Sequence, residues 1–360
     1  MSASKALVLA VSVCCQHRAI LNPLQFLTNP TYELEFIVHT SILNEEFSGN
    51  LSGYISPSVL ASVKSLRSVF DNTKPFRYVA IDGFFRDDIL QALLMDFPKK
   101  DDSYWRFCSG QDGGTTQDGG TTGVNYVNAE RQSWPASYLK LDALVQSRHF
   151  LDFLQSLTGI EGLEYDKEYQ GGGIREASAQ SVQPIHLDFN YHPRTGLHRR
   201  LNLLWYLNES WDPSWGGDIE VHLDPRKFVG NSRVAGYSPI ANRLFMFETN
   251  EMSWHGVSRL DAPTNRSRRA FSLYYYTPTR PEGNLPFRNT EFAEAQLPPG
   301  LCEGHTLTKT DITELTNLLK RLDDRIQMLY ELRRGFDAKY LHLFREYEYY
   351  LERYRESIGK

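Results

Sequence analysis

The chain has 360 residues, of which 41% are hydrophobic and 23% are charged, close to the ordinary composition of globular proteins. This composition excludes a wholly disordered chain, and the formal net charge of −5 argues against a dedicated nucleic-acid binder. Four cysteines, two of them adjacent as Cys14 and Cys15, do not form a disulfide framework and favour a reducing, cytoplasmic location. Aromatic residues make up 13% of the chain, a level typical of sheet-rich folds.

The first sixty residues carry no motif that points to chemistry. Their longest apolar run, ALVLAVSVCC at 6–15, is too short to span a bilayer, which needs about 20 residues. The run could be the core of a signal peptide behind Lys5, but no cleavage site of small residues follows it. A buried strand at 6–14 is favoured, followed by a short helix at 17–27 and a second strand at 32–40. We expect residues 1–60 to form a separate segment of unknown role.

The pattern changes at Pro75. The alternating residues PFRYVAIDGFF (75–85) predict a strand, and Asp87 and Asp88 are suited to cap a helix behind it. Residues 111–122 repeat the sequence QDGGTT twice, and such a polar, glycine-rich stretch cannot bury apolar area. The repeat is either a tolerant surface loop or a lid over a substrate site.

From residue 171 to residue 278 the pattern is all-β. Short apolar stretches alternate with turn residues and predict strands at 200–208, 216–223, 242–249 and 269–277. Several of these stretches are apolar on both faces, as the core of a sandwich or barrel requires.

Beyond Pro299 the sequence predicts a long helix. Leucine, isoleucine, phenylalanine and tyrosine recur at steps of three and four from 312 to 358, which indicates a coiled-coil-like seam. Gly335 marks a kink or a turn between two helices. The seam needs a partner, and we expect a homo-oligomer through 312–358, with a folded-back hairpin or another protein as alternatives. We therefore expect a central domain at 61–300 and a helical region at 301–360.

The triplet His186-Leu187-Asp188 carries the strongest chemical signal. Residues i and i+2 of a strand point to the same face, so the imidazole and the carboxylate can bind one metal ion. A third ligand could come from His255, in the stretch EMSWHGV. Two histidines and one carboxylate leave open positions on the metal, an arrangement that suits non-haem Fe(II). His-x-Asp is weak evidence alone, because His222-Leu223-Asp224 also matches and either triplet could be purely structural.

The complete stretch resembles the prolyl-4-hydroxylase-like branch of the Fe(II)/2-oxoglutarate-dependent dioxygenases. The resemblance covers roughly 75–282 in five segments that follow the family order: PFRYVAIDGFF, HLDFNYHP, RRLNLLWYLNESWDPSWGGDIEV, SPIANRLFMFETNEMSWHGV and RRAFSLYYYTPTRP. It implies a mainly β fold with flanking helices around a double-stranded β-helix (jelly-roll) core. It also selects His186, Asp188 and His255 as the Fe(II) ligands, because the family's His-x-Asp precedes the Tyr-Leu-Asn strand, and it leaves the second triplet structural.

The resemblance further implies a 2-oxoglutarate site. The family places an arginine on the strand after the distal histidine, where a guanidinium can bind the far carboxylate of 2-oxoglutarate. Arg266, Arg268 and Arg269 stand there, and Arg269 is the expected residue because it sits just before the predicted strand. If the strand has already begun, Arg268 faces the opposite way. Tyr206 matches a tyrosine that assists this carboxylate in some members, with a core tyrosine as the alternative.

The expected function is a dioxygenase that uses Fe(II), O₂ and 2-oxoglutarate, with ascorbate as reductant. It would hydroxylate a peptidyl (prolyl-type) or small-molecule C–H bond and release succinate and CO₂. The alternative is a non-catalytic interaction protein that uses the barrel and the helical tail, while a zinc hydrolase is disfavoured by the arginine strand. A basic cluster of Arg194, His198, Arg199 and Arg200 is either a solvated strand edge or an attractant for anions.

Overall fold

The computed structural model describes residues 51–99, 105–107, 125–228, 230–293, 301, 303–320, 322–323, 342, 345–347, 349–351 and 353. The elements predicted within residues 6–40, the repeat at 111–122 and the predicted kink at Gly335 lie outside the described residues. The chain divides into two compact units, Met1–Ala293 and Glu294–Lys360. All the residues predicted to form the functional site belong to the first unit.

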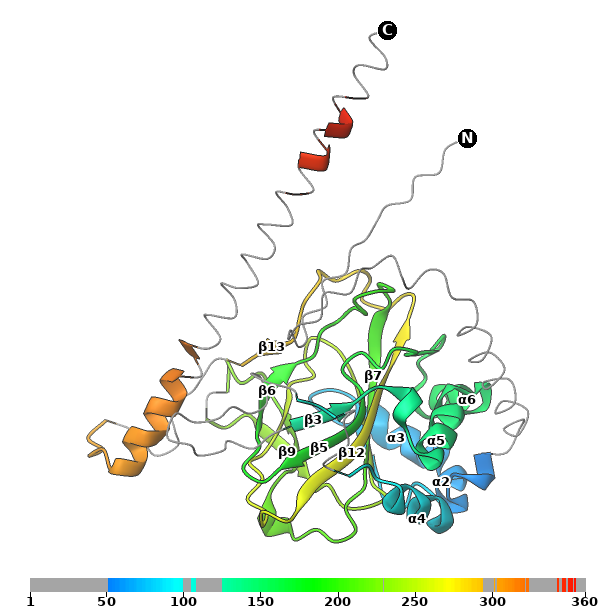
Figure 1. Ribbon diagram of the computed structural model, residues 1–360, viewed down its shortest axis with the longest axis horizontal. Helices are drawn as coiled ribbons and strands as arrows, with labels where there is room; N and C mark the ends of the chain where they lie inside the picture. Colours follow the sequence, from blue (N-terminus) through cyan, green and yellow to red (C-terminus); the bar gives the residue numbers. More distant parts are fainter. Residues whose placement is uncertain are drawn as a thin grey trace. The chain divides into compact units, whose positions relative to one another are not determined.

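Two antiparallel sheets form the first unit (Figure 1). The larger has the order β1-β10-β7-β12-β5-β3-β2, with β4 paired to β12. Its strands are Tyr78–Ile81 (β1), Leu244–Glu248 (β10), His198–Tyr206 (β7), Ser267–Thr277 (β12), Gly173–Ser178 (β5), Asn125–Asn128 (β3), Arg106–Phe107 (β2) and Glu164–Tyr165 (β4). The smaller, ordered β13-β6-β11-β8-β9, consists of Glu291–Phe292 (β13), Gln183–Leu187 (β6), His255–Val257 (β11), Ile219–His222 (β8) and Arg233–Tyr237 (β9).

The strand order confirms the predicted jelly-roll core. Strands β5-β12-β7-β10 form one wall and β6-β11-β8-β9 form the other. From β5 to β12 the chain passes from one sheet to the other at every step except the hairpin of β8 and β9. The strands predicted at 200–208, 216–223, 242–249 and 269–277 are confirmed as β7, β8, β10 and β12.

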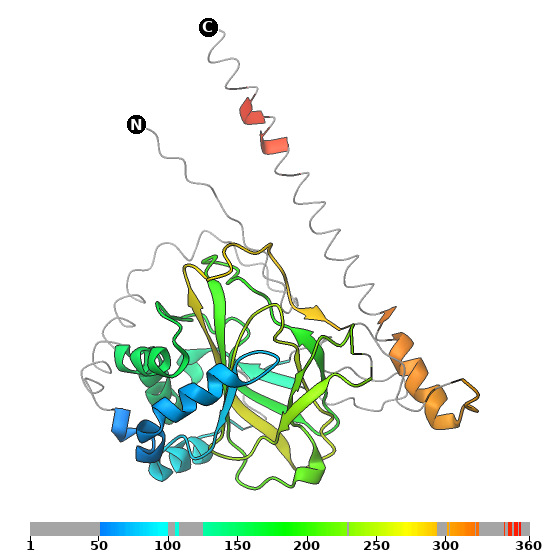
Figure 2. The same ribbon diagram turned by 180° about the vertical axis from the view of Figure 1, so that it is seen from behind.

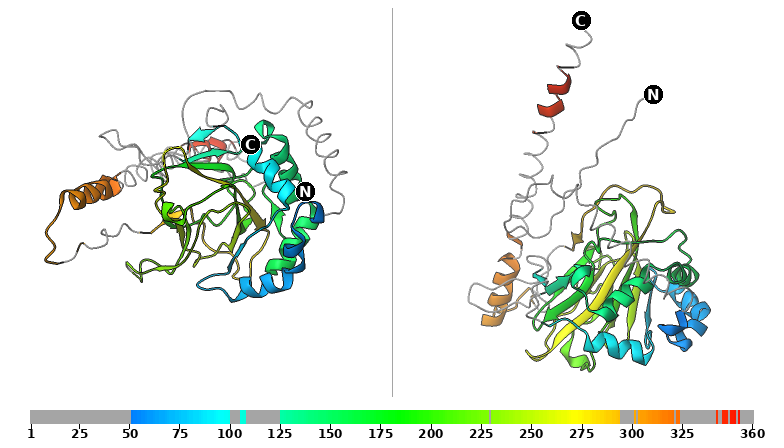
Figure 3. Two further views of the ribbon diagram at one scale, coloured as in Figure 1. Left: turned by 90° about the horizontal axis from the view of Figure 1, so that it is seen from below. Right: turned by 45° about the vertical axis from the view of Figure 1, so that its right-hand side comes forward.

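The helices of the first unit gather on one side of the larger sheet (Figures 2 and 3). They are Pro57–Ala61 (α2), Val63–Asn72 (α3), Asp87–Met95 (α4), Ala136–Gln146 (α5) and Arg148–Thr158 (α6), with short 3₁₀ turns at Leu51–Gly53 (η2), Arg131–Ser133 (η3) and Pro213–Trp215 (η4). The predicted helix behind residue 86 is confirmed as α4. Its capping was predicted wrongly, because Asp87 and Asp88 lie in the first turn and Arg86 is the N-cap residue. The two carboxylates therefore act on the helix dipole.

Strand alternation gives the larger sheet an outer and an inner core. On β7, Leu203 and Trp205 face outward and pack with the helices, whereas Tyr206 joins a second cluster with Ile219 and Val257 of the smaller sheet. This confirms the predicted burial of both strand faces. Ile55 and Val59, which precede the predicted boundary at residue 60, also belong to the outer core.

In the second unit the structure describes a helix at 309–320. Two members of the predicted seam, Ile312 and Leu319, are exposed there by 53% and 66%, and self-association of the seam stays a prediction. Among the described helices, none combines the length and the apolar character that crossing a membrane would require.

Candidate metal centre

The smaller sheet brings His186, Asp188 and His255 together. His186 lies on β6, Asp188 directly follows that strand, and His255 is the first residue of β11. The two histidines are register partners across β6 and β11, and their ring centroids lie 4.3 Å apart. One potential ligand atom from each of the three residues lies within 4.8 Å of the others.

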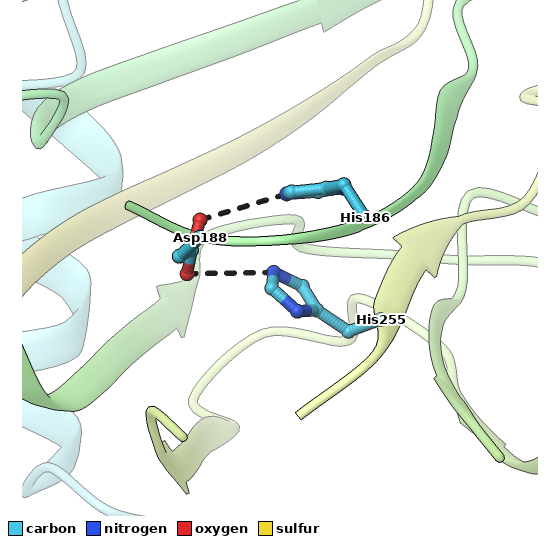
Figure 4. Close-up of side chains that lie close together, drawn as sticks. All are labelled: His186, Asp188 and His255. Carbon is cyan, nitrogen blue, oxygen red and sulfur yellow. Dashed lines mark ion pairs between the residues drawn. The ribbon is translucent and has the colours of Figure 1, made fainter. Parts of the chain in front are cut away.

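The carboxylate of Asp188 faces both imidazole rings, with one oxygen toward each ring (Figure 4). Its Oδ1 is 3.6 Å from Nε2 of His186, and its Oδ2 is 3.6 Å from Nε2 of His255. All three side chains are buried. The donor atoms therefore converge on one point that is shielded from bulk water.

The backbone fixes both imidazole rings in the form that a metal ion needs. Nδ1 of His186 lies 2.8 Å from the carbonyl oxygen of Pro184, and Nδ1 of His255 lies 2.8 Å from that of Ser253. A carbonyl oxygen only accepts hydrogen bonds, so each Nδ1 carries the proton and each Nε2 presents a lone pair. The donor set fits a divalent metal held by two histidines and one carboxylate.

The charge states of His255 and Asp188 also fit a site for a divalent metal. Burial lowers the pKa of His255 to about 3, and the neighbouring His186 contributes in the same direction, so His255 is neutral at pH 7. Burial alone would raise the pKa of Asp188, but the Arg199 charge and the two histidines outweigh it and hold the pKa well below its usual value. A neutral imidazole and an ionised carboxylate are the ligand forms of both groups.

A β-bulge places a further polar side chain beside the triad. The register between β6 and β11 shifts between His255 and Val257, and such bulges re-aim side chains. The amide Nε2 of Gln183 consequently lies 3.4 Å from Nε2 of His186. Gln183 also lines a cavity whose other walls include Ala177 and Arg268.

The structure does not bring the second His-x-Asp triplet together. His222 bonds to Ser232, with Nδ1 and Oγ 2.9 Å apart, and Asp224 pairs with Arg226 at 2.9 Å. In the described part of the chain, the triad with His186 is the only group of three such ligands. This arrangement agrees with the structural role expected for His222 and Asp224.

The structure places Arg268 rather than Arg269 beside Tyr206. The buried Arg268 donates from Nη2 to the Tyr206 hydroxyl at 3.0 Å and from Nε to the Gly217 carbonyl at 2.8 Å. Arg269 points to the other side of β12, where its Nε lies 3.3 Å from Glu176 Oε1 and its side chain is 41% exposed. Arg269 and Tyr206, the two residues expected to bind the far carboxylate of 2-oxoglutarate, therefore point to different sides of the larger sheet, and the role of Arg269 stays a prediction. Strand β12 begins at Ser267, so Arg268 and Arg269 both lie within the strand and point to opposite faces.

Three of the four residues of the basic cluster are neither a solvated edge nor an exposed attractant, whereas Arg194 is exposed and pairs with Glu168. His198, Arg199 and Arg200 are buried, and Arg200 pairs with Glu248 at 3.0 Å. Arg199 donates from Nη2 to Asp188 Oδ2 at 2.9 Å. Sequence reasoning missed this contact, because no local motif connects a residue of β7 with the end of β6.

Comparisons with known proteins agree with this geometry. Residues 174–276 match the family model described as the 2OG-Fe(II) oxygenase superfamily. The mouse prolyl 3-hydroxylase OGFOD1 is 34% identical over 90 residues, which make up 23% of this chain and 15% of that protein. The chain thus spans a small part of the length of this curated relative.

Solved structures of low similarity include prolyl hydroxylases. One is a Trichoplax adhaerens prolyl hydroxylase in complex with a hypoxia inducible factor peptide fragment, with a TM-score of 0.41, 16% identity, and coverage of 61% of this chain and 93% of that chain. Another is a Pseudomonas putida prolyl-4-hydroxylase, with a TM-score of 0.38, 17% identity, and coverage of 59% and 98%.

The matched segment runs from β5 to β12 and contains all three residues of the triad. Fe(II) and 2-oxoglutarate, which give the superfamily its name, are the cofactor and cosubstrate that the sequence predicted. Through residues 174–276, the chain is similar to the 2OG-Fe(II) oxygenase superfamily.

Proposed function

We propose that the chain is an Fe(II)- and 2-oxoglutarate-dependent hydroxylase in which His186, Asp188 and His255 hold the metal. The observation that carries the proposal is the convergence of the three donor groups within 4.8 Å, with both histidine Nε2 atoms free of backbone partners. When bound, Fe(II) would activate O₂, with 2-oxoglutarate as the co-reductant, for C–H hydroxylation with release of succinate and CO₂. The protein holds three ligands on one side of the metal ion and leaves the opposite coordination positions open.

Arg268 is the proposed anchor for the far carboxylate of 2-oxoglutarate. It donates hydrogen bonds to two uncharged oxygens, the Tyr206 hydroxyl and the Gly217 carbonyl, so its charge is not neutralised by these partners. A buried guanidinium of this kind binds a carboxylate strongly. Arg268 also lines the same cavity as Gln183, which lies beside His186.

A prolyl side chain is the first substrate to test, because the mouse relative is a prolyl 3-hydroxylase. Proline-containing peptides and small molecules can be screened together by succinate release in the presence of Fe(II), 2-oxoglutarate and ascorbate. We expect turnover that disappears with a metal chelator and returns when Fe(II) is restored. Absence of 2-oxoglutarate turnover, both with and without these substrates, would contradict the proposal.

A further inference from the structure

Asp188 carries two hydrogen bonds on one of its carboxylate oxygens. Arg199 donates from Nη2 to Oδ2 at 2.9 Å, and Asn202 donates from Nδ2 to the same Oδ2 at 3.2 Å. Both donors belong to β7, in the sheet opposite the one that carries the metal ligands. A carboxylate oxygen has about two lone-pair sites. The two donors therefore fill Oδ2 and leave Oδ1 free.

The packing around Arg199 prevents its guanidinium from moving away. The residue is 1% exposed, and its guanidinium carbon lies 3.4 Å from the centre of the Tyr274 ring and 4.4 Å from the centre of the Phe189 ring. Contact with aromatic faces stabilises the cation in this position. Arg199 is therefore a fixed donor.

Without these donors the carboxylate would be free to bind a metal through both oxygens. Oδ1 and Oδ2 each lie 3.6 Å from one of the two histidine Nε2 atoms, as Figure 4 shows, so both oxygens border the point where the metal ligands meet. A second bond from Asp188 would occupy a coordination position that a two-His, one-carboxylate centre otherwise keeps open.

We propose that Arg199 and Asn202 are positioning residues that restrict Asp188 to one-oxygen ligation through Oδ1. The inference rests on the proposed function, because it presumes that the triad binds a metal. Its consequence is that the open positions remain available to a chelating cosubstrate. Losing Arg199 should therefore weaken cosubstrate binding while the metal stays bound, since the carboxylate left behind keeps its negative charge.

The test compares Arg199→Met with a matched control, Arg200→Met. Arg200 is the adjacent residue of β7, is also buried, and pairs with Glu248 on the other side of the sheet. For each full-length protein, Co(II) binding is titrated, the visible spectrum of bound Co(II) is recorded, and 2-oxoglutarate binding to the Co(II)-loaded protein is measured by calorimetry. Asn202→Leu removes one donor without changing any charge, and it decides the matter if Arg199→Met does not fold.

We expect Arg199→Met to keep Co(II), to change the Co(II) spectrum, and to bind 2-oxoglutarate more weakly, by about 10–100-fold if the loss matches the usual loss of activity when a partner of a metal ligand is removed. Asn202→Leu should change both properties in the same direction by less, and Arg200→Met should change neither. An unchanged Co(II) spectrum in both Arg199→Met and Asn202→Leu would overturn the inference, even if Arg199→Met weakened 2-oxoglutarate binding through its lost charge. Loss of Co(II) from a folded Arg199→Met protein would also overturn it. Failure of the wild-type protein to bind Co(II) would overturn the proposed function itself.

Discussion

The opposite orientations of Arg268 and Arg269 on β12 allow a decisive test of the cosubstrate site. Replacing Arg268 with Met removes a buried guanidinium beside Tyr206. Loss of one partner of a buried charge pair costs about 2–5 kcal/mol of binding. At about 1.4 kcal/mol for each tenfold change, the apparent affinity for 2-oxoglutarate should fall by roughly 30-fold to several thousand-fold.

Arg269→Met is the matched variant and should behave in the opposite way. Glu176, its partner at 3.3 Å, has a side chain that is only 2% exposed, whereas the Arg269 side chain is 41% exposed. The loss of this half-exposed pair should cost about 1–3 kcal/mol of folding stability, between the values typical of surface and buried pairs. Because Arg269 faces away from Tyr206, the affinity for 2-oxoglutarate should stay near that of the wild-type protein.

Two measurements separate the variants. Succinate release at varied 2-oxoglutarate concentrations gives the apparent affinity, and chemical denaturation gives the free energy of unfolding. The reasoning is refuted if Arg269→Met weakens 2-oxoglutarate binding while Arg268→Met leaves it unchanged. Arg268→Lys adds a further check, since it keeps the charge but loses the bidentate fork and should recover part of the affinity.

The remaining predictions concern the metal ligands and the second unit. Asp188→Ala should abolish iron-dependent 2-oxoglutarate turnover, while Asp224→Ala should keep most of it. The reverse result would show that the triplet with Asp224, and not the triplet with Asp188, supplies the metal ligands. With a chelator present, the neutral, buried His255 should make the free energy of unfolding fall as the pH drops from 6.5 towards its folded pKa of about 3, by on the order of 1 kcal/mol per pH unit, because the unfolded chain takes up the proton first. Denaturation curves at several pH values should show a shallower slope for His255→Gln, and an equal slope would disprove this effect. If the 312–358 seam self-associates, light scattering should show an oligomer for the full chain and a monomer for a chain that ends at residue 299. Finding both chains monomeric would disprove self-association.

The parts of the fold that follow from periodicity were predictable from the sequence. Strands β7, β10 and β12 are buried on both faces, so their sequences are long apolar runs that few other structures would accommodate. The triplet at His186 was predictable because a period of two puts both side chains on one face. The choice between Arg268 and Arg269 stayed open, because a strand start predicted from sequence is uncertain by about two or more residues and neighbouring residues of a strand face opposite ways.

Helices α5 and α6 were not predicted, for two different reasons. Helix α5 buries Tyr138, Leu141, Asp142, Ala143, Leu144 and Val145, so it lacks a clear apolar stripe. Helix α6 does carry end signals, since Ser147 accepts a hydrogen bond from the Phe150 amide at 3.2 Å and Gly159 ends the helix with a positive φ of 66°. Reading Ser147 and Gly159 as the two caps would have located this helix.

The inner face of β7 and β12 explains why the contacts of Asp188 had no sequence signal. Asn202 and Ser272 share this face with Tyr206 and Arg268, and within the described residues Asn202 Oδ1 and Ser272 Oγ are buried without a hydrogen-bond partner. Leaving a buried polar atom without a hydrogen bond costs about 1–3 kcal/mol of folding free energy. A protein tolerates this cost mainly where a bound polar ligand supplies the missing hydrogen bond. Apolar periodicity predicts the outer face because packing alone selects its residues. The inner face is selected by its bound partners, whose chemistry becomes visible only when the fold has brought β6, β7, β11 and β12 together.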